Sequence, residues 1–193
     1  MDKPHGKDAV IKAIIEAAIP LIAERGVTNV SFRDIAKAAN VNHGLITHYF
    51  GSKEVLMQRV GLHLSDSMFR AAQARGDDLR TIWERVFKEN SIQIRAMIRI
   101  LLDTSADRSR KFLQFVDEIL LWLQSEQKKN HLNPNVDPDV LMFMTAALLV
   151  GSEIIGPHIK EALHLSDEAF NKLRPQAFLA LLQEFQEPSP SST

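Results

Sequence analysis

The spacing of apolar residues constrains this chain more than any other feature, since it follows the period of an α-helix almost everywhere along the sequence. Apolar positions at i, i+3, i+4 and i+7 form one side of a helix, whereas a half-buried strand requires strict alternation of apolar and polar residues. No segment of the sequence shows a sustained alternation bounded by turn residues. The sequence therefore predicts an all-α protein.

The first helix is expected at about residues 7–25, with Gly26 after it as a left-handed stop. Pro20 falls inside this helix, where a proline removes one backbone hydrogen bond and can cost about 3 kcal/mol. Pro20 follows Lys12 and Glu16 at intervals of four residues, so it lies on the side of the helix expected to face solvent. Water can therefore reach the carbonyl group that loses its partner. A kink rather than a break is expected there.

Two short helices and the start of a longer one are expected next. Ser31, with Asp34 three residues later, resembles a capping box. Asn42 can cap a second short helix to about residue 48 or 49, and Ser52 can cap the longer helix. Two short helices joined by a tight turn are what a helix-turn-helix requires. The apolar residues expected to pack these helices against the first are Ile35, Ala36, Val41, Ile46 and Phe50.

The second short helix carries the chemistry needed to contact DNA. Asn42, His43 and Thr47 can donate or accept hydrogen bonds at base edges. Gly44 lets the backbone approach closely, and Leu45 can contact a thymine methyl group. Groups suited to phosphate follow, namely the Tyr49 hydroxyl and the Ser52–Lys53 helix start with its free amides and its cation.

A simpler alternative is that residues 31–50 form a packed helix pair in an all-α core, with polar residues exposed for no functional reason. Short helical pairs are common, so topology alone favours neither interpretation.

The wider pattern favours DNA binding. Residues 10–57 closely resemble the N-terminal domain of the tetracycline-repressor (TetR/AcrR-type) family of transcriptional regulators, with AERGV, SFRDIAKAA, V-x-x-G-x-I-x-H-Y-F and GSKEVL in the right order and spacing. The resemblance implies base or groove contacts at Arg33, His43, Gly44, Leu45 and Thr47, and phosphate contacts at Ser31, Tyr49 and Lys53. The complete predicted DNA-binding set is Ser31, Arg33, Asn42, His43, Gly44, Leu45, Thr47, His48, Tyr49 and Lys53.

This sequence departs from the usual family pattern at a few positions. Asn40 replaces the common turn glycine, which is tolerable because Asn enters left-handed geometry more readily than most residues. Leu45 and Thr47 stand where a threonine and an aromatic residue are frequent, so the operator sequence cannot be taken from a relative. Pro20 is also unusual.

The rest of the chain is expected to form further helices, one of them apolar on every side. That helix, at about 138–163, contains VLMFMTAALLVG and must be covered all round. A partner subunit or burial within one subunit can achieve this, and the resemblance implies a homodimer whose last two long helices form a four-helix bundle. Small residues that permit close helix approach are Ala146, Ala147, Gly151 and Ser152. The expected helices are about 53–74, 78–102, 106–129, 138–163 and 167–186.

A small-molecule site is implied by the resemblance in the middle of the chain. Aromatic and methionine residues recur there at helical spacing, although a plain core is the commoner role of any one of them. The candidate effector-binding residues are Trp83, Phe87, Met97, Phe112, Phe115 and Trp122.

Composition narrows the class of protein. There are no cysteines, which excludes disulfides and thiolate metal sites. The uncharged, largely apolar stretch from Val140 to Ser152 is shorter than the roughly 20 apolar residues that span a bilayer. The start MDKPHGKD lacks the apolar run of a secretory signal. Residues 1–53 carry seven basic and five acidic side chains, which permits an anionic partner. A soluble, cytoplasmic protein is expected.

Signals for enzymatic chemistry are poor. Glu161-x-x-His164 matches half of a di-iron pattern, but no second copy is found in the sequence. His43 and His48 are too far round a helix to share a metal in the usual way, and nucleophile elbows and P-loops are absent. We therefore expect no catalytic residues, no metal and no cofactor.

These observations predict a homodimeric DNA-binding transcriptional regulator, a repressor that a small-molecule effector releases from a palindromic operator. The predicted domains are a helix-turn-helix domain at 1–53, a helical effector-binding and dimerisation domain at 54–187, and a flexible tail at 188–193. The alternatives are a helical small-ligand-binding protein without DNA activity and, less favoured, a di-iron enzyme.

Overall fold

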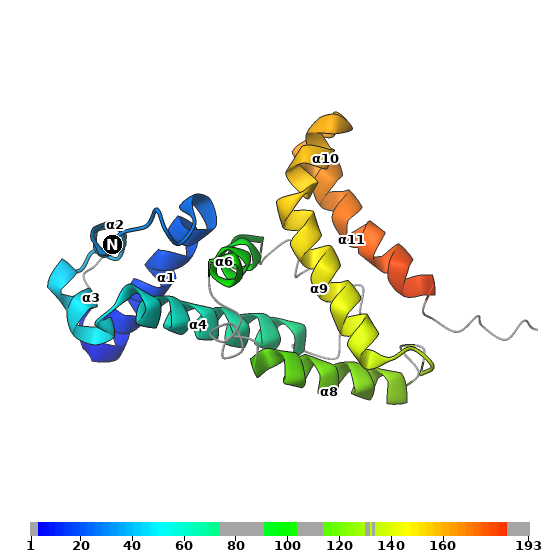
Figure 1. The fold of residues 1–193 in the computed structure, drawn as a ribbon, viewed down its shortest axis with the longest axis horizontal. Helices are drawn as coiled ribbons and strands as arrows, with labels where there is room; N and C mark the ends of the chain where they lie inside the picture. The colour runs from blue at the N-terminus through cyan, green and yellow to red at the C-terminus, as the bar shows by residue number, and fades with distance from the viewer. Residues whose placement is uncertain (1–3, 74–90, 104–113, 130–131, 133, 185–193) are drawn as a thin grey trace, which may run out of the picture. The chain divides into compact units, whose positions relative to one another are not determined.

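The computed structural model describes residues 4–73, 91–103, 114–129, 132 and 134–184. Throughout these ranges the regular secondary structure is helical, which confirms the all-α prediction (Figure 1). The helices are α1 (Lys7–Arg25), α2 (Phe32–Ala38), α3 (His43–Phe50), α4 (Lys53–Gln73), α6 (Ser91–Leu102), α8 (Gln114–Lys128), α9 (Pro138–Ile154), α10 (Gly156–Ala162) and α11 (Asp167–Glu184).

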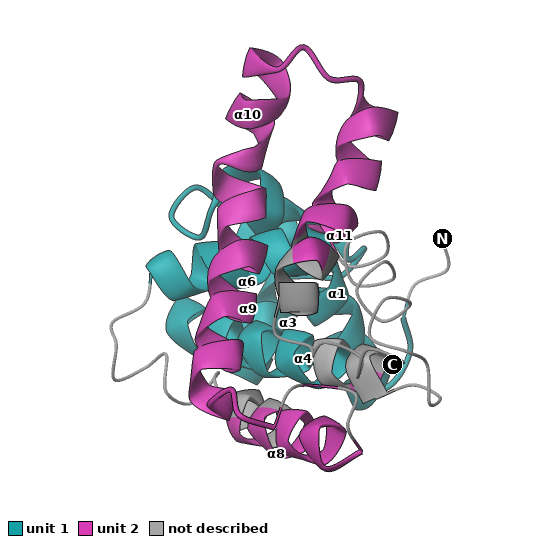
Figure 2. Ribbon diagram, turned by 90° about the vertical axis from the view of Figure 1, so that its right-hand side faces the viewer, with its two compact units in different colours: residues 1–68, 92–114 teal, residues 69–91, 115–193 magenta. Residues whose placement is uncertain are grey.

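The chain divides into two compact units, which Figure 2 shows in different colours. Unit 1 comprises residues 1–68 and 92–114, and unit 2 comprises residues 69–91 and 115–193. Unit 1 therefore contains not only α1, α2 and α3 but also most of α4 and α6. The proposed domain boundary after residue 53 lies inside this unit.

Helix α1 runs without interruption through Pro20 and ends as expected. Pro20 is exposed together with Lys12 and Glu16, whose charged groups lie 3.7 Å apart. Water can therefore solvate the carbonyl group that Pro20 leaves without its helical donor. Gly26 ends the helix at a φ of 75°, and its amide donates to the Ile22 carbonyl oxygen.

One hydrophobic core holds unit 1 together, and α6 contributes to it. Ile14 of α1, Ile35 of α2 and Ile46 of α3 are fully buried. Complete burial of each such side chain stabilises the fold by about 1.5–3 kcal/mol. Of the five residues predicted to pack these helices, Ile35, Ala36, Ile46 and Phe50 are buried and Val41 is half-buried. The contribution of α6 to the same core is Ala96, Met97 and Ile100.

The prediction of one continuous helix over 138–163 is wrong. Helix α9 ends at Ile154, α10 begins at Gly156, and the two are bent by 57°. Pro157 explains the break, because it has no N–H to donate to the carbonyl of Glu153 and its ring clashes there. Within the described ranges, no single helix is long and apolar enough to cross a membrane, and α9 and α10 reach that length and hydropathy only as this bent pair.

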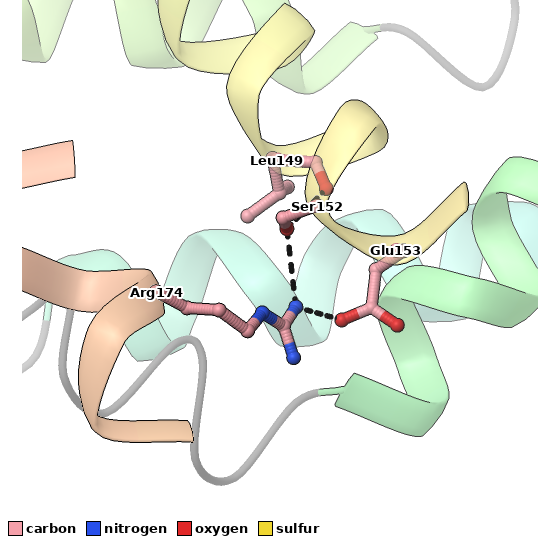
Figure 3. A network of polar contacts seen from close by, with 4 residues as sticks. All are labelled: Leu149, Ser152, Glu153 and Arg174. Carbon is pink, nitrogen blue, oxygen red and sulfur yellow. Dashed lines mark hydrogen bonds and ion pairs between the residues drawn. The ribbon is translucent and has the colours of Figure 1, made fainter. Parts of the chain in front are cut away.

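A buried ionic cluster joins α9 to α11 in unit 2 (Figure 3). Arg174 forms an ion pair with Glu153, and its Nη2 also donates to the Ser152 Oγ at 3.1 Å. The two charged side chains are only 8% and 3% exposed. The Arg174 guanidinium lies 5.6 Å from the centroid of the Phe170 ring. Gly156 accommodates that ring, because an added Cβ would lie 2.7 Å from the Phe170 Cζ.

Candidate nucleic-acid interface

The start of α2 is a complete capping box. The Asp34 amide donates to the Ser31 Oγ at 3.2 Å, while the Ser31 amide and hydroxyl donate to the Asp34 Oδ2 at 2.9 and 2.5 Å. The bond from the Ser31 hydroxyl, followed by the bond from the Ser31 amide, holds the pKa of the Asp34 carboxyl below its ordinary value. Ser31, predicted to contact phosphate, is exposed but uses its hydroxyl to stabilise the helix.

The turn between α2 and α3 has the geometry expected of a helix-turn-helix. Asn40 adopts a left-handed conformation with a φ of 53°, which confirms that it can replace the usual glycine. The Val41 amide then donates to the Ala36 carbonyl oxygen at 3.0 Å. This short turn brings α3 directly after α2, and Val41 is half-buried against the core.

Helix α3 has one buried side and one exposed polar side. Ile46 and Phe50 are buried in the core of unit 1, so they set the orientation of the helix. Leu45 and Tyr49 are half-buried beside them. The exposed residues of α3 and its cap are Asn42, His43, Gly44, Thr47 and His48, all of which belong to the predicted DNA-binding set.

The N-terminal end of α3 is built by Asn42. Its Oδ1 accepts a hydrogen bond from the Gly44 amide at 2.8 Å, which confirms the predicted cap. A Cβ at Gly44 would lie 3.3 Å from the same oxygen, closer than ordinary van der Waals contact. The side-chain NH₂ group of Asn42 keeps its two donors for another partner.

Two aromatic contacts orient the histidines of α3. The His43 ring lies 6.3 Å from the Phe32 ring, centroid to centroid, with the planes tilted by 60°. The His48 ring meets the Tyr49 ring edge-on at 5.0 Å. Both histidines are exposed, and their rings are therefore displayed to solvent from defined positions.

Cations lie on the elements that flank α3. Arg33, which belongs to the predicted DNA-binding set, and Lys37, which does not, are both exposed on α2. Their spacing of four residues places them on the same side of that helix. Lys53, the first residue of α4, is half-buried, and its Nζ donates to the Thr28 carbonyl oxygen at 3.2 Å.

Of the candidate effector residues, two have described side chains, Met97 and Trp122, and they belong to different units. Met97 is buried in the core of unit 1. Trp122 is half-buried in a separate small cluster of unit 2, against Leu123, Leu132 and Leu141. Trp83, Phe87, Phe112 and the side chain of Phe115 lie outside the described residues. For the part of the chain that is described, no group of three or more His, Asp or Glu residues is arranged to hold a metal ion.

Sequence comparisons identify the family to which this N-terminal arrangement belongs. Residues 14–60 match the family model for bacterial regulatory proteins of the tetR family. An HTH-type transcriptional repressor of Mycobacterium tuberculosis is 38% identical over 100 residues, which are 52% of this chain and 50% of the relative. The repressor KstR2 of Rhodococcus jostii is 34% identical over 86 residues, covering 43% and 42% of the two chains. The chain thus spans about half the length of the curated relatives it matches.

Solved structures share the fold over a longer span. A TetR-family transcriptional regulator from Rhodococcus aligns with a TM-score of 0.67 at 18% identity, covering 91% of this chain and all of the other. The fatty acid degradation regulator FadR of Bacillus halodurans aligns with a TM-score of 0.65 at 20% identity, covering 92% and 97%. Together with the match at residues 14–60, these similarities agree with the resemblance seen in the sequence. Residues 14–60 thus match the tetR family of bacterial regulatory proteins, and the fold over most of the chain is shared with the solved structures.

Proposed function

We propose that this protein is a transcriptional regulator that binds duplex DNA through α3 and acts as a repressor. The observation that carries the proposal is the exposed polar side of α3. On the opposite side of this helix, Ile46 and Phe50 are buried in the core of unit 1 and fix its orientation. Names of related proteins give further support, since two relatives are called HTH-type transcriptional repressors. Such a protein acts in the bacterial cytoplasm, where the chromosome lies.

In this proposal, α3 enters the major groove with its N-terminal end first. His43 and Thr47 contact base edges, and the guanidinium of Arg33 suits a bidentate contact with guanine. Lys53 and the Tyr49 hydroxyl contact phosphates, so they add affinity without reading sequence. Leu45 is half-buried, which leaves part of its side chain for contact with a thymine methyl group.

We further propose that a second copy of the chain covers the apolar side of α9. Val140, Phe143 and Ile154 are exposed there, and the spacing of these positions with Ala147 follows one side of the helix. Phe143 is 75% exposed. A Cβ built on Gly151 meets no atom within 4 Å, so another helix has room to approach. A symmetric dimer then presents two α3 helices to the two halves of a palindromic operator.

Release of the protein from DNA by a small-molecule effector is proposed from the resemblance to this family. The name of the related FadR structure concerns fatty acid degradation, and it describes that protein alone.

Selection of genomic DNA fragments by the purified protein at physiological salt tests the proposal. We expect enrichment of sites with two-fold symmetry and specific affinities in the range of about 10⁻⁸ to 10⁻¹¹ M. Reporter expression from a selected promoter should fall when the protein is present. Equal retention of all fragments would contradict sequence-specific regulation and would favour the alternative, a helical ligand-binding protein without DNA activity.

A further inference from the structure

The loop between α1 and α2 is held by two side chains from distant parts of the sequence. The Val27 amide donates to the Asp103 Oδ2 at 3.2 Å, across 76 residues. The next residue, Thr28, accepts at its carbonyl oxygen the hydrogen bond from the Lys53 Nζ. Both contacts lie within unit 1. One of the two side chains, Lys53, belongs to the predicted DNA-binding set, whereas Asp103 has no role in the DNA contacts proposed above.

Asp103 is carried to this loop by a well-anchored helix. Met97 and Ile100 of α6 are buried in the same core as α1. The Asp103 amide donates to the Arg99 carbonyl oxygen at 3.1 Å, so the residue continues the last turn of α6. The position of its carboxylate is therefore set by the packing of α6.

Local electrostatics do not account for an aspartate at this position. The C-terminal end of a helix carries a partial negative charge, so a carboxylate there is disfavoured. A carboxylate in the domain that binds DNA is also repelled by phosphates. The contact with the Val27 amide offsets these effects, because a charged acceptor forms a stronger hydrogen bond than a neutral one.

We propose that Asp103 is a positioning residue for DNA binding, and this inference rests on the proposed function. By accepting a hydrogen bond from the Val27 amide, Asp103 fixes the loop. The carbonyl group of the next residue, Thr28, in turn orients the Lys53 ammonium group. The same loop leads through the buried Val30 into Ser31, the cap of α2. Asp103 thus acts on the DNA-contacting residues without touching DNA.

The sign of a substitution effect separates this role from simple charge repulsion. If Asp103 acted only through its charge, Asp103→Ala would strengthen DNA binding. If it positions the loop, Asp103→Ala weakens DNA binding despite the loss of a negative charge. Asp103→Asn removes the charge but keeps a side-chain oxygen that can accept from the Val27 amide.

The experiment compares full-length Asp103→Ala, Asp103→Asn and unmodified protein on one selected DNA fragment. We expect Asp103→Ala to lose about 3- to 10-fold in affinity, the range that corresponds to one hydrogen bond, and Asp103→Asn to stay within about 2-fold of the unmodified protein or to bind more tightly. Amide hydrogen exchange at Val27, followed by NMR, should quicken in the Ala variant and be restored in the Asn variant. Asp66→Ala, which removes an exposed carboxylate of α4 in the same unit, serves as the charge-matched control and should bind DNA at least as tightly.

Two results would overturn the inference. The first is DNA binding by Asp103→Ala that equals or exceeds that of the unmodified protein. The second is exchange at Val27 that does not respond to the substitution. Failure of the unmodified protein to bind any DNA would instead contradict the proposed function, and the role of Asp103 in DNA binding would fall with it. The Val27 exchange rates would still report whether the contact between Val27 and Asp103 forms.

Discussion

The Lys53 Nζ donates a hydrogen bond to the Thr28 carbonyl oxygen at 3.2 Å, so the cation expected to reach phosphate is already directed by a backbone group. This contact limits the positions that the ammonium group can adopt before DNA arrives. A phosphate is a stronger acceptor than a neutral carbonyl, because a charged acceptor strengthens the hydrogen bond. Lys53 can therefore exchange one partner for the other, or share its three donors between them.

Lys53→Ala should weaken binding to specific and random duplexes by similar factors. Loss of one phosphate contact should reduce the slope of log affinity against log salt by about 1. Titrations at several salt concentrations measure this slope. Lys128→Ala, which removes an exposed cation from α8 in unit 2, is the control and should leave the slope unchanged. A loss confined to the specific duplex would contradict a phosphate role for Lys53.

Thr47→Ala should change sequence preference rather than general affinity. Thr47 is exposed on the polar side of α3, and a lost base contact costs about 1–3 kcal/mol of discrimination at one base pair. Repeated selection of genomic fragments with the variant should show relaxed preference at one position in each half of the operator. Binding to random DNA should stay close to that of the unmodified protein. An unchanged preference would place Thr47 outside the base-reading set.

Phe143→Ser should weaken self-association of the chain. The side chain is 75% exposed, so the protomer loses little of its own core, whereas a dimer built on α9 loses a large buried aromatic group. Sedimentation over a range of concentrations should show dissociation at higher protein concentration than for the unmodified chain. Leu121→Ser on α8 changes a similarly exposed apolar residue, at 67%, and should leave association unchanged. Equal effects of the two substitutions would contradict an interface on α9.

Arg174→Met should destabilise unit 2 by about 3–5 kcal/mol, because it removes the guanidinium that forms an ion pair with the buried Glu153 carboxylate. Urea unfolding at neutral pH measures the loss. The double variant Arg174→Met with Glu153→Leu should recover most of it, since both charges are then absent from the buried cluster. A double variant as unstable as the single one would show that packing of the Arg174 side chain, rather than its charge, is what matters.

The capping box of α2 should make stability depend on pH. Because the folded-state pKa of Asp34 lies below its ordinary value of 3.8, the ionised carboxylate stabilises the folded state above that value. This contribution is lost as pH falls through the lower, folded-state pKa. The difference in unfolding free energy between the unmodified protein and Ser31→Ala should therefore be largest near neutral pH and shrink below about pH 4. In an Asp34→Asn background the same comparison should show little dependence on pH in this range.

Much of the N-terminal architecture could be predicted because its signals are local. The capping box of Ser31 and Asp34, the Asn42 cap and the stop at Gly26 each involve residues within four positions of one another. The left-handed Asn40 depends on the conformational range of one side chain. Helical spacing likewise identified Ile46 and Phe50 as buried, which decides which residues of α3 face solvent.

The break after α9 had a local signal that the helical pattern concealed. Pro157 directly follows Gly156, but the uninterrupted apolar spacing of residues 138–163 favoured one long helix. Proline in the first turn of a new helix loses nothing, because its missing N–H would have no partner there. Gly156 at the break also packs closely against Phe170 of α11. Phe170 is too far along the sequence for a local pattern to predict this contact.

Other relationships exist only once the helices have packed. The contact between Val27 and Asp103 joins residues 76 positions apart, and the ion pair of Arg174 with Glu153 joins two helices through buried charges. Periodicity and capping act over a few residues and specify which segments are helical and which of their sides are apolar. The choice of partner helix, and with it the inclusion of α6 in unit 1, depends on the shapes and volumes of side chains meeting across the core.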